Sequence, residues 1–304
     1  MKKRTILLSL CLCLAILLSS CSNQTPPNDN DGSKPSEGNE VQYSLYLSDS
    51  YGSAILNLNL PSEQIQTKPA DEKNFFVSSK TKIEDPDNIG STRTLKIAGQ
   101  SYDLDYTRTY RTKLYESDQL KSHAEIIDFR KNKIRAEYRA SDGELLFFGD
   151  LNMEGRNISG DLTEDEAKEL AVSTLTEVYG KDIFNEYVFD YVLFTDNQST
   201  KRYSVVYTKY VHGIPTNDMI QMGFNLNGNL ISINALMLGV YDNAEKDITK
   251  EQIDNALAYL NSTLEEVSLP TLIVDSLGDY YLRAYSSTTV NGAYMPFIVY
   301  INIE

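Results

Sequence analysis

Residues 161–166 read Asp-Leu-Thr-Glu-Asp-Glu, and residues 247–252 read Asp-Ile-Thr-Lys-Glu-Gln. In both stretches a Thr is followed three residues later by Glu or Gln, which is the pattern of a capping box at a helix N-terminus. Apolar residues at helical spacing follow each box, so each stretch predicts the start of an amphipathic helix. The predicted apolar faces are Ala167, Leu170, Ala171, Leu175 and Val178 in the first helix, and Ile253, Ala256, Leu257, Leu260 and Leu264 in the second.

Strand-like stretches follow both helices. Apolar residues alternate with polar or small ones before Asn227-Gly228, a pair that favours a hairpin turn because both residues tolerate a positive φ. The predicted strands cover residues 187–194, 203–211, 218–226 and 229–236 after the first helix, and 271–276, 280–286 and 293–303 after the second. We interpret this pattern as a duplication, with one helix packed on an antiparallel sheet twice and a shorter second copy. The alternative is that two common capping boxes coincide by chance.

The region before the first helix is predicted to be rich in β-strand. Apolar and polar side chains alternate over residues 55–60, and Asp142-Gly143 predicts a hairpin between residues 133–140 and 145–148. The predicted fold class is therefore α+β, with antiparallel β-meanders each packed by one helix, preceded by a β-rich N-terminal region.

Three short stretches carry a family resemblance: residues 162–167, residues 207–215, which end in His212-Gly213-Ile214-Pro215, and residues 224–231. Together they resemble the PepSY-like domains of secreted Gram-positive proteins. The second stretch also resembles the propeptides of thermolysin-like metalloproteases, with His212 in place of their Asn. The resemblance implies two PepSY-like, cystatin-like units and a non-catalytic module that restrains peptidases near the cell surface. The family motif contains no catalytic residue, so none is transferred to this chain.

The N-terminus has the pattern of a secretory signal, because Lys2-Lys3-Arg4 precedes the mostly apolar residues 6–18. A helix of that length spans about 20 Å, less than the roughly 30 Å hydrocarbon core of a bilayer, which disfavours a transmembrane anchor. Leu18-Ser19-Ser20-Cys21 resembles the lipobox of bacterial lipoproteins. This resemblance implies cleavage before Cys21, lipidation of its thiol with a palmitate-type chain, and a location on the outer face of the cell membrane. A plain secretory signal is the alternative.

Composition excludes several classes of site. Loss of residues 1–20 would remove Cys11 and Cys13, which would leave no thiol in the folded part for a disulfide, a nucleophile or a metal site. Residues 22–40 contain no aliphatic or aromatic side chain, which predicts a disordered tether. The formal net charge is −15, which argues against a nucleic-acid partner and against polybasic attachment to a membrane.

The motifs of common enzyme classes are absent from the sequence. It contains no His-Glu-x-x-His, no Gly-x-Ser-x-Gly, no Walker-type loop and no dinucleotide-binding fingerprint. A Ser-His-Asp triad stays open, because its members meet only in the fold, but His123 is predicted to be solvated and His212 to lie in a turn. The lack of Trp disfavours a glycoside hydrolase, whose cleft is usually lined by sugar-stacking aromatics. We predict no catalytic residue, no cofactor and no metal.

Tyrosine is abundant, with 21 Tyr against 10 Phe. By period-two spacing, Tyr102, Tyr106 and Tyr110 share one face of a predicted strand. They either pack within a half-buried sheet or form a face that binds a protein or an extended peptide, and an exposed edge strand could add main-chain hydrogen bonds to such a partner. These three tyrosines and residues 212–215 are the candidate interaction residues.

The predicted organisation has five parts. They are a lipoprotein signal peptide (residues 1–20), a tether (21–40), a β-rich region (41–158), PepSY-like unit 1 (159–245) and a short PepSY-like unit 2 (246–304). The leading hypothesis is a lipid-anchored, non-catalytic binding or regulatory module of the cell envelope, with a protein or peptide partner and an envelope or secreted peptidase as the candidate target. The alternatives are a hydrolase with an unrecognised cleft and a small-ligand-binding lipoprotein. The second alternative is disfavoured by the lack of a long alternating βα pattern.

Overall fold

A computed structural model describes residues 45–47, 65–67, 80–85, 89–112, 121–153, 159–196, 200–264, 267–275, 278–290 and 293–303. The signal segment, Cys21 and the tether lie outside these residues, and so do most positions between 41 and 79.

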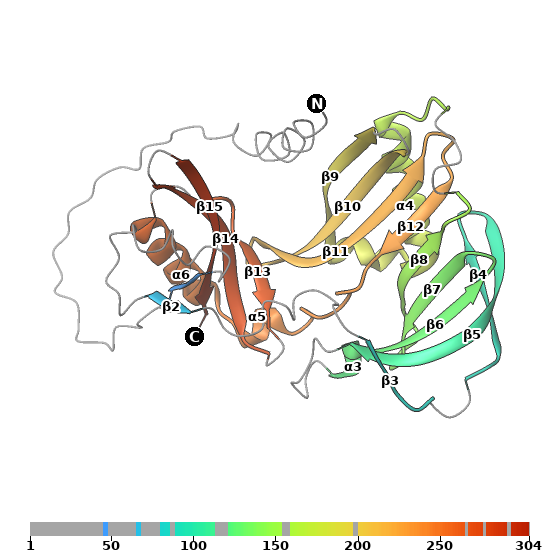
Figure 1. The fold of residues 1–304 in the computed structure, drawn as a ribbon, viewed down its shortest axis with the longest axis horizontal. Helices are drawn as coiled ribbons and strands as arrows, with labels where there is room; N and C mark the ends of the chain where they lie inside the picture. The colour runs from blue at the N-terminus through green and yellow to red at the C-terminus, as the bar shows by residue number, and fades with distance from the viewer. Residues whose placement is uncertain are drawn as a thin grey trace. The chain divides into compact units, whose positions relative to one another are not determined.

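The strands of the larger sheet are all antiparallel (Figure 1): β3 (Lys80–Lys82), β4 (Thr92–Ile97), β5 (Gln100–Thr112), β6 (Glu125–Lys131), β7 (Ile134–Arg139), β8 (Leu145–Asp150), β9 (Tyr187–Asp196), β10 (Lys201–Val211), β11 (Ile214–Asn225) and β12 (Leu230–Asn234). From β5 the spatial order is β5-β6-β7-β8-β12-β11-β10-β9, and β3 and β4 both pair with β5.

A smaller sheet follows in the chain. It comprises β13 (Thr271–Val274), β14 (Tyr280–Val290) and β15 (Ala293–Asn302), together with β1 (Leu45–Leu47) and β2 (Ile65–Thr67). Neighbouring strands are antiparallel except β1 and β2, which run parallel. Thr216 of β11 pairs in parallel with Leu272 of β13, so β11 connects the two sheets.

The two predicted helices and their capping boxes are confirmed. They are α4 (Glu164–Tyr179), capped by Thr163, and α6 (Lys250–Thr263), capped by Thr249. The other helical segments are short: α3 (Lys121–Ala124), η5 (Lys181–Asn185) and α5 (Ala244–Asp247). The hairpins at Asp142-Gly143 and Asn227-Gly228 also form where the sequence predicted them, with a positive φ at each Gly.

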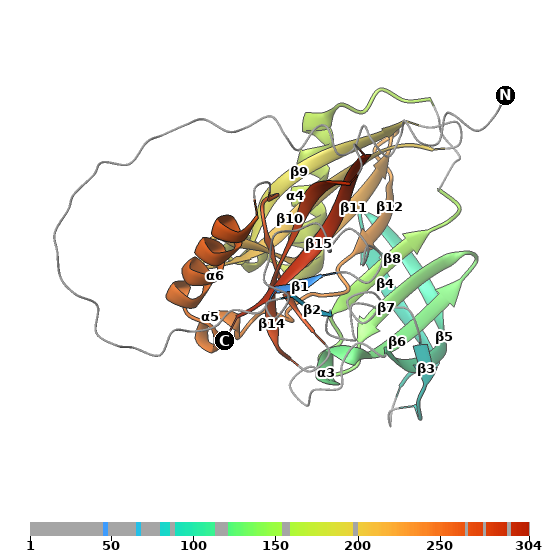
Figure 2. The same cartoon turned by 60° about the vertical axis from the view of Figure 1, so that its left-hand side comes forward.

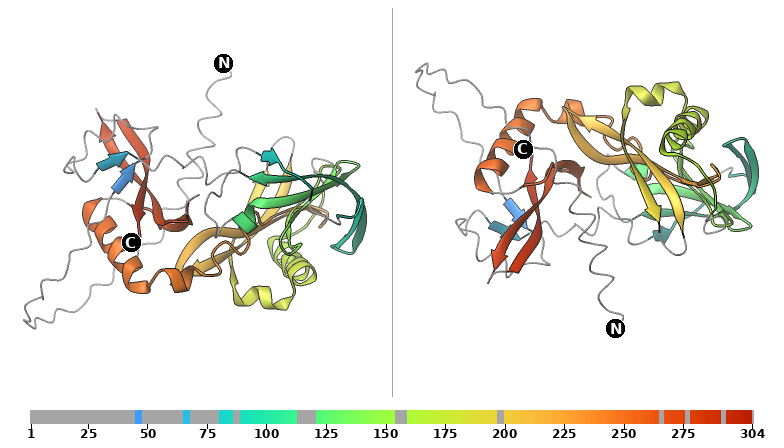
Figure 3. Two further views of the ribbon diagram at one scale, coloured as in Figure 1. Left: turned by 90° about the horizontal axis from the view of Figure 1, so that it is seen from below. Right: turned by 90° about the horizontal axis from the view of Figure 1, so that it is seen from above.

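Each long helix packs on one sheet. Figure 3 shows α4 beside the larger sheet. Its buried residues Ala167, Ala171 and Leu175 lie in the same core as Phe148 of β8 and Met222 of β11. Figure 2 shows α6 beside β14 and β15. Its buried face belongs to a second core, which includes residues of both strands. Both helices therefore bury the apolar faces that their sequences predicted.

The predicted fold class is nevertheless wrong, since the described residues are mostly β and do not divide into two α+β, cystatin-like units. The finding that overturns it is the pairing of β8 with β12, in which Phe148 lies opposite Ile233. This pairing joins the strands before α4 to the meander after it in one antiparallel sheet. Hydrophobic periodicity identifies a strand and its buried face but not its neighbours, because strand partners are set by long-range packing.

The capping box of α4 generates a stability prediction. In Thr163→Ala the side-chain oxygen that accepts from the Glu166 backbone N–H at 3.3 Å is lost. We expect the free energy of unfolding to fall by about 1 kcal/mol. Urea unfolding would measure this change, and Thr249→Ala at the matching position of α6 should behave alike. An unchanged urea midpoint in both variants would contradict the structural role of the boxes.

Candidate functional site

β9 is an edge strand with an apolar surface. It pairs with β10 along its length and with no other strand among the described residues. Five of its ten residues are large apolar side chains that are each 41–55% exposed: Val188, Phe189, Tyr191, Leu193 and Phe194. An edge strand leaves a row of backbone N–H and C=O groups without a partner, so it can accept a strand from another chain.

A bulge at Asp190 shifts the register of this strand. Tyr191 lies opposite Val206, whereas Phe189 lies opposite Tyr207, so Asp190 has no position of its own in the ladder. Its carboxylate instead accepts a hydrogen bond from the Thr208 hydroxyl at 2.9 Å. A bulge reverses the inward and outward alternation on its two sides, and therefore it distributes the apolar side chains of β9 over both faces.

Apolar side chains indeed lie on both faces of β9. Phe194 packs against Tyr203 of β10, with 4.8 Å between ring centroids, on the face that Tyr203 shares with the core around α4. Tyr191 and Leu193 alternate with Phe194 and point to the opposite face, where Leu193 lies opposite Ser204. A strand added beyond β9 would therefore bury apolar surface above and below the sheet.

The charges on β9 are negative. The strand carries Asp190 and Asp196 and no basic residue. Lys201 of β10 pairs with Asp196 at 3.2 Å, and the Lys168 ammonium of α4 lies 5.6 Å from the centroid of the Phe189 ring. The edge is thus apolar along its length with a carboxylate in the bulge and another at its end.

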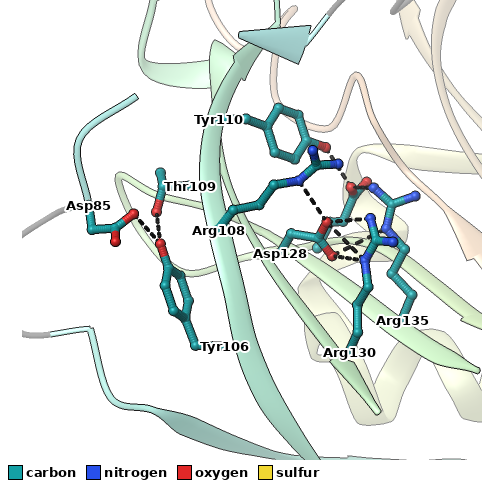
Figure 4. A network of polar contacts seen from close by, with 9 residues as sticks. Asp85, Tyr106, Arg108, Thr109, Tyr110, Asp128, Arg130 and Arg135 are labelled. Atoms are coloured by element: carbon teal, nitrogen blue, oxygen red, sulfur yellow. Dashed lines mark hydrogen bonds and ion pairs between the residues drawn. The ribbon is translucent and has the colours of Figure 1, made fainter. Parts of the chain in front are cut away.

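The three candidate tyrosines of β5 do not share one face, and that expectation is wrong. Tyr106 lies opposite Phe129 and Arg108 opposite Asp128, so Thr107 is an extra residue in a bulge that reverses the alternation. Figure 4 accordingly shows Tyr106 and Tyr110 on opposite sides of the strand.

The same tyrosines are packed to different degrees. Tyr102 is half-buried, with its ring centroid 5.4 Å from that of Phe148, and Tyr106 is half-buried beside Thr109 at 3.1 Å between hydroxyl oxygens. Tyr110 is fully buried and donates its hydroxyl to Glu137 at 2.5 Å. Tyr110 therefore belongs to the core, and the exposed apolar surface lies on β9 instead.

The stretch 212–215 forms the tight turn between β10 and β11. His212 and Gly213 both have a positive φ, at 49° and 86°, and Ile214 pairs back with Val211. The His212 Nε2 atom lies 2.9 Å from the backbone carbonyl oxygen of Ile248, so the turn contacts the segment before α6. Pro215 continues the ladder opposite Tyr210. Sequence reasoning placed this turn correctly, but His212 contacts this chain's own backbone.

His123 differs from the prediction that it is solvated. It is half-buried in α3, and its Nδ1 lies 3.0 Å from the Arg139 guanidinium. Burial and the charge of Arg139 both lower the pKa of His123. Since no Ser or Asp contacts its ring among the described interactions, its contacts are those of a packed side chain.

A buried polar cluster lies around Asp218 of β11. Its Oδ2 accepts from the Tyr187 hydroxyl at 2.8 Å and from the Gly239 backbone N–H at 3.0 Å. Burial raises the pKa of Asp218 to about 7, although these bonds and the charge of Lys209 oppose the shift. Lys209 is itself held by an ion pair to Asp242. The cluster ties β9, β10 and β11 to the turn after β12, and its charge changes near neutral pH.

Comparison of the chain with protein-family models, with curated proteins and with solved structures finds no match. No group of three or more His, Cys, Asp or Glu in the described residues is arranged to hold a metal ion. Among the helices of the described part, none has the length and apolar character needed to cross a bilayer. Among the described elements, β9 carries the greatest number of exposed large apolar side chains, and its edge is therefore the candidate functional site.

The Asp218 cluster predicts a pH dependence of stability. Below pH 4 the carboxyl group is protonated in both states, because its ordinary pKa is 3.8. Between about pH 4 and 7 the unfolded chain releases this proton while the folded chain keeps it, so stability falls as the pH rises through that window. Relative to Asp218→Asn, the wild type should lose about 1.4 kcal/mol of unfolding free energy per pH unit there, and nothing further above pH 7. Urea unfolding at a series of pH values checks this, and a pH-independent difference between the two proteins would sink it.

Proposed function

We propose that this chain is a lipid-anchored binding protein of the cell envelope that captures an extended segment of a partner protein along β9. The observation that carries the proposal is the β9 edge itself, which is ten residues long, open on its outer side among the described residues and apolar on both faces. A partner strand would pair with its free backbone groups, and alternate side chains of that strand would cover the two faces.

The apolar side chains supply the driving force. Full burial of one such side chain from water contributes roughly 1.5–3 kcal/mol, so burying the exposed half of each contributes about 1 kcal/mol. Five side chains on β9 are in this state. Their gross contribution is about 5 kcal/mol before the entropy cost of association, and main-chain hydrogen bonds add to it. Because this sum is comparable to the entropy cost of association, the proposed contact depends on the main-chain hydrogen bonds as well as on the apolar side chains.

Charge defines the partner segment. β9 carries Asp190 and Asp196, and the whole chain has a formal net charge of −15. A second copy of the chain would bring two acidic edges together, which like-charge repulsion opposes. We therefore infer that the occupant is an apolar segment with Lys or Arg among its outward residues.

The sequence supports the proposed location and suggests a first candidate partner. With Cys21 lipidated, the protein stays at the outer face of the membrane, where envelope and secreted proteins are its neighbours. The likeness of residues 207–215 to protease propeptides makes a peptidase the first candidate partner. That part of the proposal rests on the sequence alone.

Edge variants test the binding surface. Leu193→Lys places a charge on the exposed face of β9, and lysine on an edge strand is a known obstacle to strand addition. Val172→Lys on α4 is the matched control, because Val172 is 44% exposed and Leu193 is 50% exposed. With residues 22–304 as bait against envelope and secreted proteins, we expect one partner that the wild type and Val172→Lys retain and that Leu193→Lys loses by at least tenfold. Cross-links from that partner should map to β9.

Two outcomes would contradict this design. Equal recovery of the partner by all three baits would place the binding surface elsewhere. A Leu193-dependent dimer seen by light scattering, with no partner recovered, would make a second copy of the chain the occupant.

The anchor has its own test. In cells that process lipoproteins, we expect labelled palmitate to enter the wild type and not Cys21→Ser, because the thiol is the atom that carries the lipid. The wild type should remain in the membrane fraction, whereas Cys21→Ser should be released after detergent-free washing. A Cys21→Ser protein that is still labelled and retained would refute lipidation at this position.

A further inference from the structure

A cluster of arginines lies on one face of β5, β6 and β7. Arg108 is paired in the ladder with Asp128, Asp128 with Glu137, and Arg130 with Arg135. Directly paired residues of antiparallel strands project to the same face, so all five side chains lie together. Figure 4 shows the three arginines around Asp128. The opposite face of these strands carries core residues such as Phe129 and Ala136.

Two buried carboxylates hold the three guanidinium groups in place. The Asp128 side chain is 0% exposed and accepts from Arg130 Nη2 at 2.6 Å, from Arg135 Nε at 3.3 Å and from Arg108 Nε at 3.4 Å. Glu137 is 2% exposed and pairs with Arg135. Burial alone would raise the pKa of Asp128, but the hydrogen bonds from Arg130 and Arg135 hold it below its ordinary value. The arginines are therefore ordered before any ligand arrives, which lowers the entropy cost of binding.

Each guanidinium keeps donors free. Arg108 uses only its Nε, and Arg130 and Arg135 use Nε and Nη2, so both Nη atoms of Arg108 and one on each of the others have no hydrogen-bond partner among the described residues. Their side chains are 38%, 43% and 28% exposed, so solvent reaches the cluster. Asp105 lies opposite Arg130 on the same face and pairs with Lys131, so four cations face three carboxylates here, which leaves one positive charge in a chain that is strongly acidic overall.

The same face continues into a hollow of about 310 Å³. Gly149 of β8 lies opposite Arg135 on one side and Ser232 on the other, which places the hollow directly beside the arginines. Ser204, Ser232 and Asn234 line it, and these side chains offer hydrogen bonds to hydroxyl groups. The Phe147 ring lies between the cluster and the hollow: its centroid is 5.4 Å from the Arg135 guanidinium, and Phe147 also lines the hollow.

We propose that this surface binds a phosphate ester of a polyol or sugar, with the phosphate on Arg108, Arg130 and Arg135 and the hydroxyl groups in the hollow. Three guanidinium groups from three strands match the several oxygens of a phosphate, whereas one guanidinium with two parallel hydrogen bonds is enough for a carboxylate. The site lies on strands other than β9 and does not depend on the strand-binding function. The phosphate can come from a soluble ester or from a lipid headgroup.

The test titrates glycerol 3-phosphate into residues 22–304 at low ionic strength, with calorimetric detection. We expect saturable binding that weakens at least tenfold in Arg108→Gln. Arg108 is the right position, because its contact to Asp128 is the longest of the three and Asp128 keeps both other arginines. Arg111→Gln is the matched control, since Arg111 lies on the same strand, is 45% exposed and pairs with Glu125. Arg111→Gln should bind as the wild type does.

Further arms separate the sources of the phosphate. Arg108-dependent sedimentation with phosphatidylglycerol vesicles and not with phosphatidylcholine vesicles assigns the site to a lipid headgroup, whereas binding of the soluble ester alone assigns it to free esters. If urea unfolding shows that Arg108→Gln does not fold as the wild type does, Arg108→Lys replaces it. Loss of the bidentate guanidinium in Arg108→Lys should still weaken binding. No binding of either phosphate probe by the wild type, equal weakening by Arg111→Gln, or equal affinity for glutamate would each overturn the proposal.

Discussion

The pairing of β8 with β12 is the constraint on which the rest of the structure depends. It places Phe148 opposite Ile233 and Gly149 opposite Ser232. One face of the joint is the core under α4, while the other face carries the hollow. Because strands from before and after α4 share this ladder, the arginines of β5–β7 and the polar residues of β10–β12 lie on one continuous face. Without that pairing the cluster and the hollow would belong to separate surfaces.

Two bulges then decide which side chains are available. The extra residue Thr107 places Arg108 and Tyr110 on the side of Asp128, while Tyr106 stays over the core residue Phe129. The extra residue Asp190 spreads the apolar residues of β9 over both faces. In each case one added residue moves a whole run of side chains to the other side of the sheet, since strand alternation has a period of two.

Local features of the fold could be predicted from the sequence, and long-range ones could not. Each capping box joins Thr163 or Thr249 to a residue three positions later, and Asn227-Gly228 forms the turn between two consecutive strands. Each of these signals therefore lies within a few consecutive residues. Phe148 and Ile233 lie far apart in the sequence, on either side of α4, and no residue pattern in either strand identifies the other strand as its partner. The bulge at Thr107 has no sequence mark, which is why the three tyrosines of β5 were assigned to one face.

The residue patterns of the single strands do not predict the two candidate surfaces, for the same reason. Residues 187–194 form an almost continuous apolar run, a pattern typical of a strand that is buried on both faces. Its position at the edge follows only from the strand order. Arg108, Asp128 and Arg135 each read as an ordinary solvent-facing charge in its own strand, and the burial of Asp128 emerges only when three strands align.

The two surfaces differ in the ligand that each can accept, and this difference follows from where the charges lie. β9 is apolar with carboxylates at Asp190 and Asp196, so a basic apolar segment is favoured there and an anion is repelled. The face around Arg108 has a positive excess and small polar neighbours, so the same basic segment is repelled and an anion is favoured. Both sets of residues are carried by one antiparallel sheet, and β10, β11, β12 and β8 lie between β9 and the arginine strands. The hollow nevertheless reaches Ser204 of β10, which pairs with Leu193 of β9, so the hydroxyl groups of a bound ester would lie beside the strand-binding surface while its phosphate lies on the distant arginine strands.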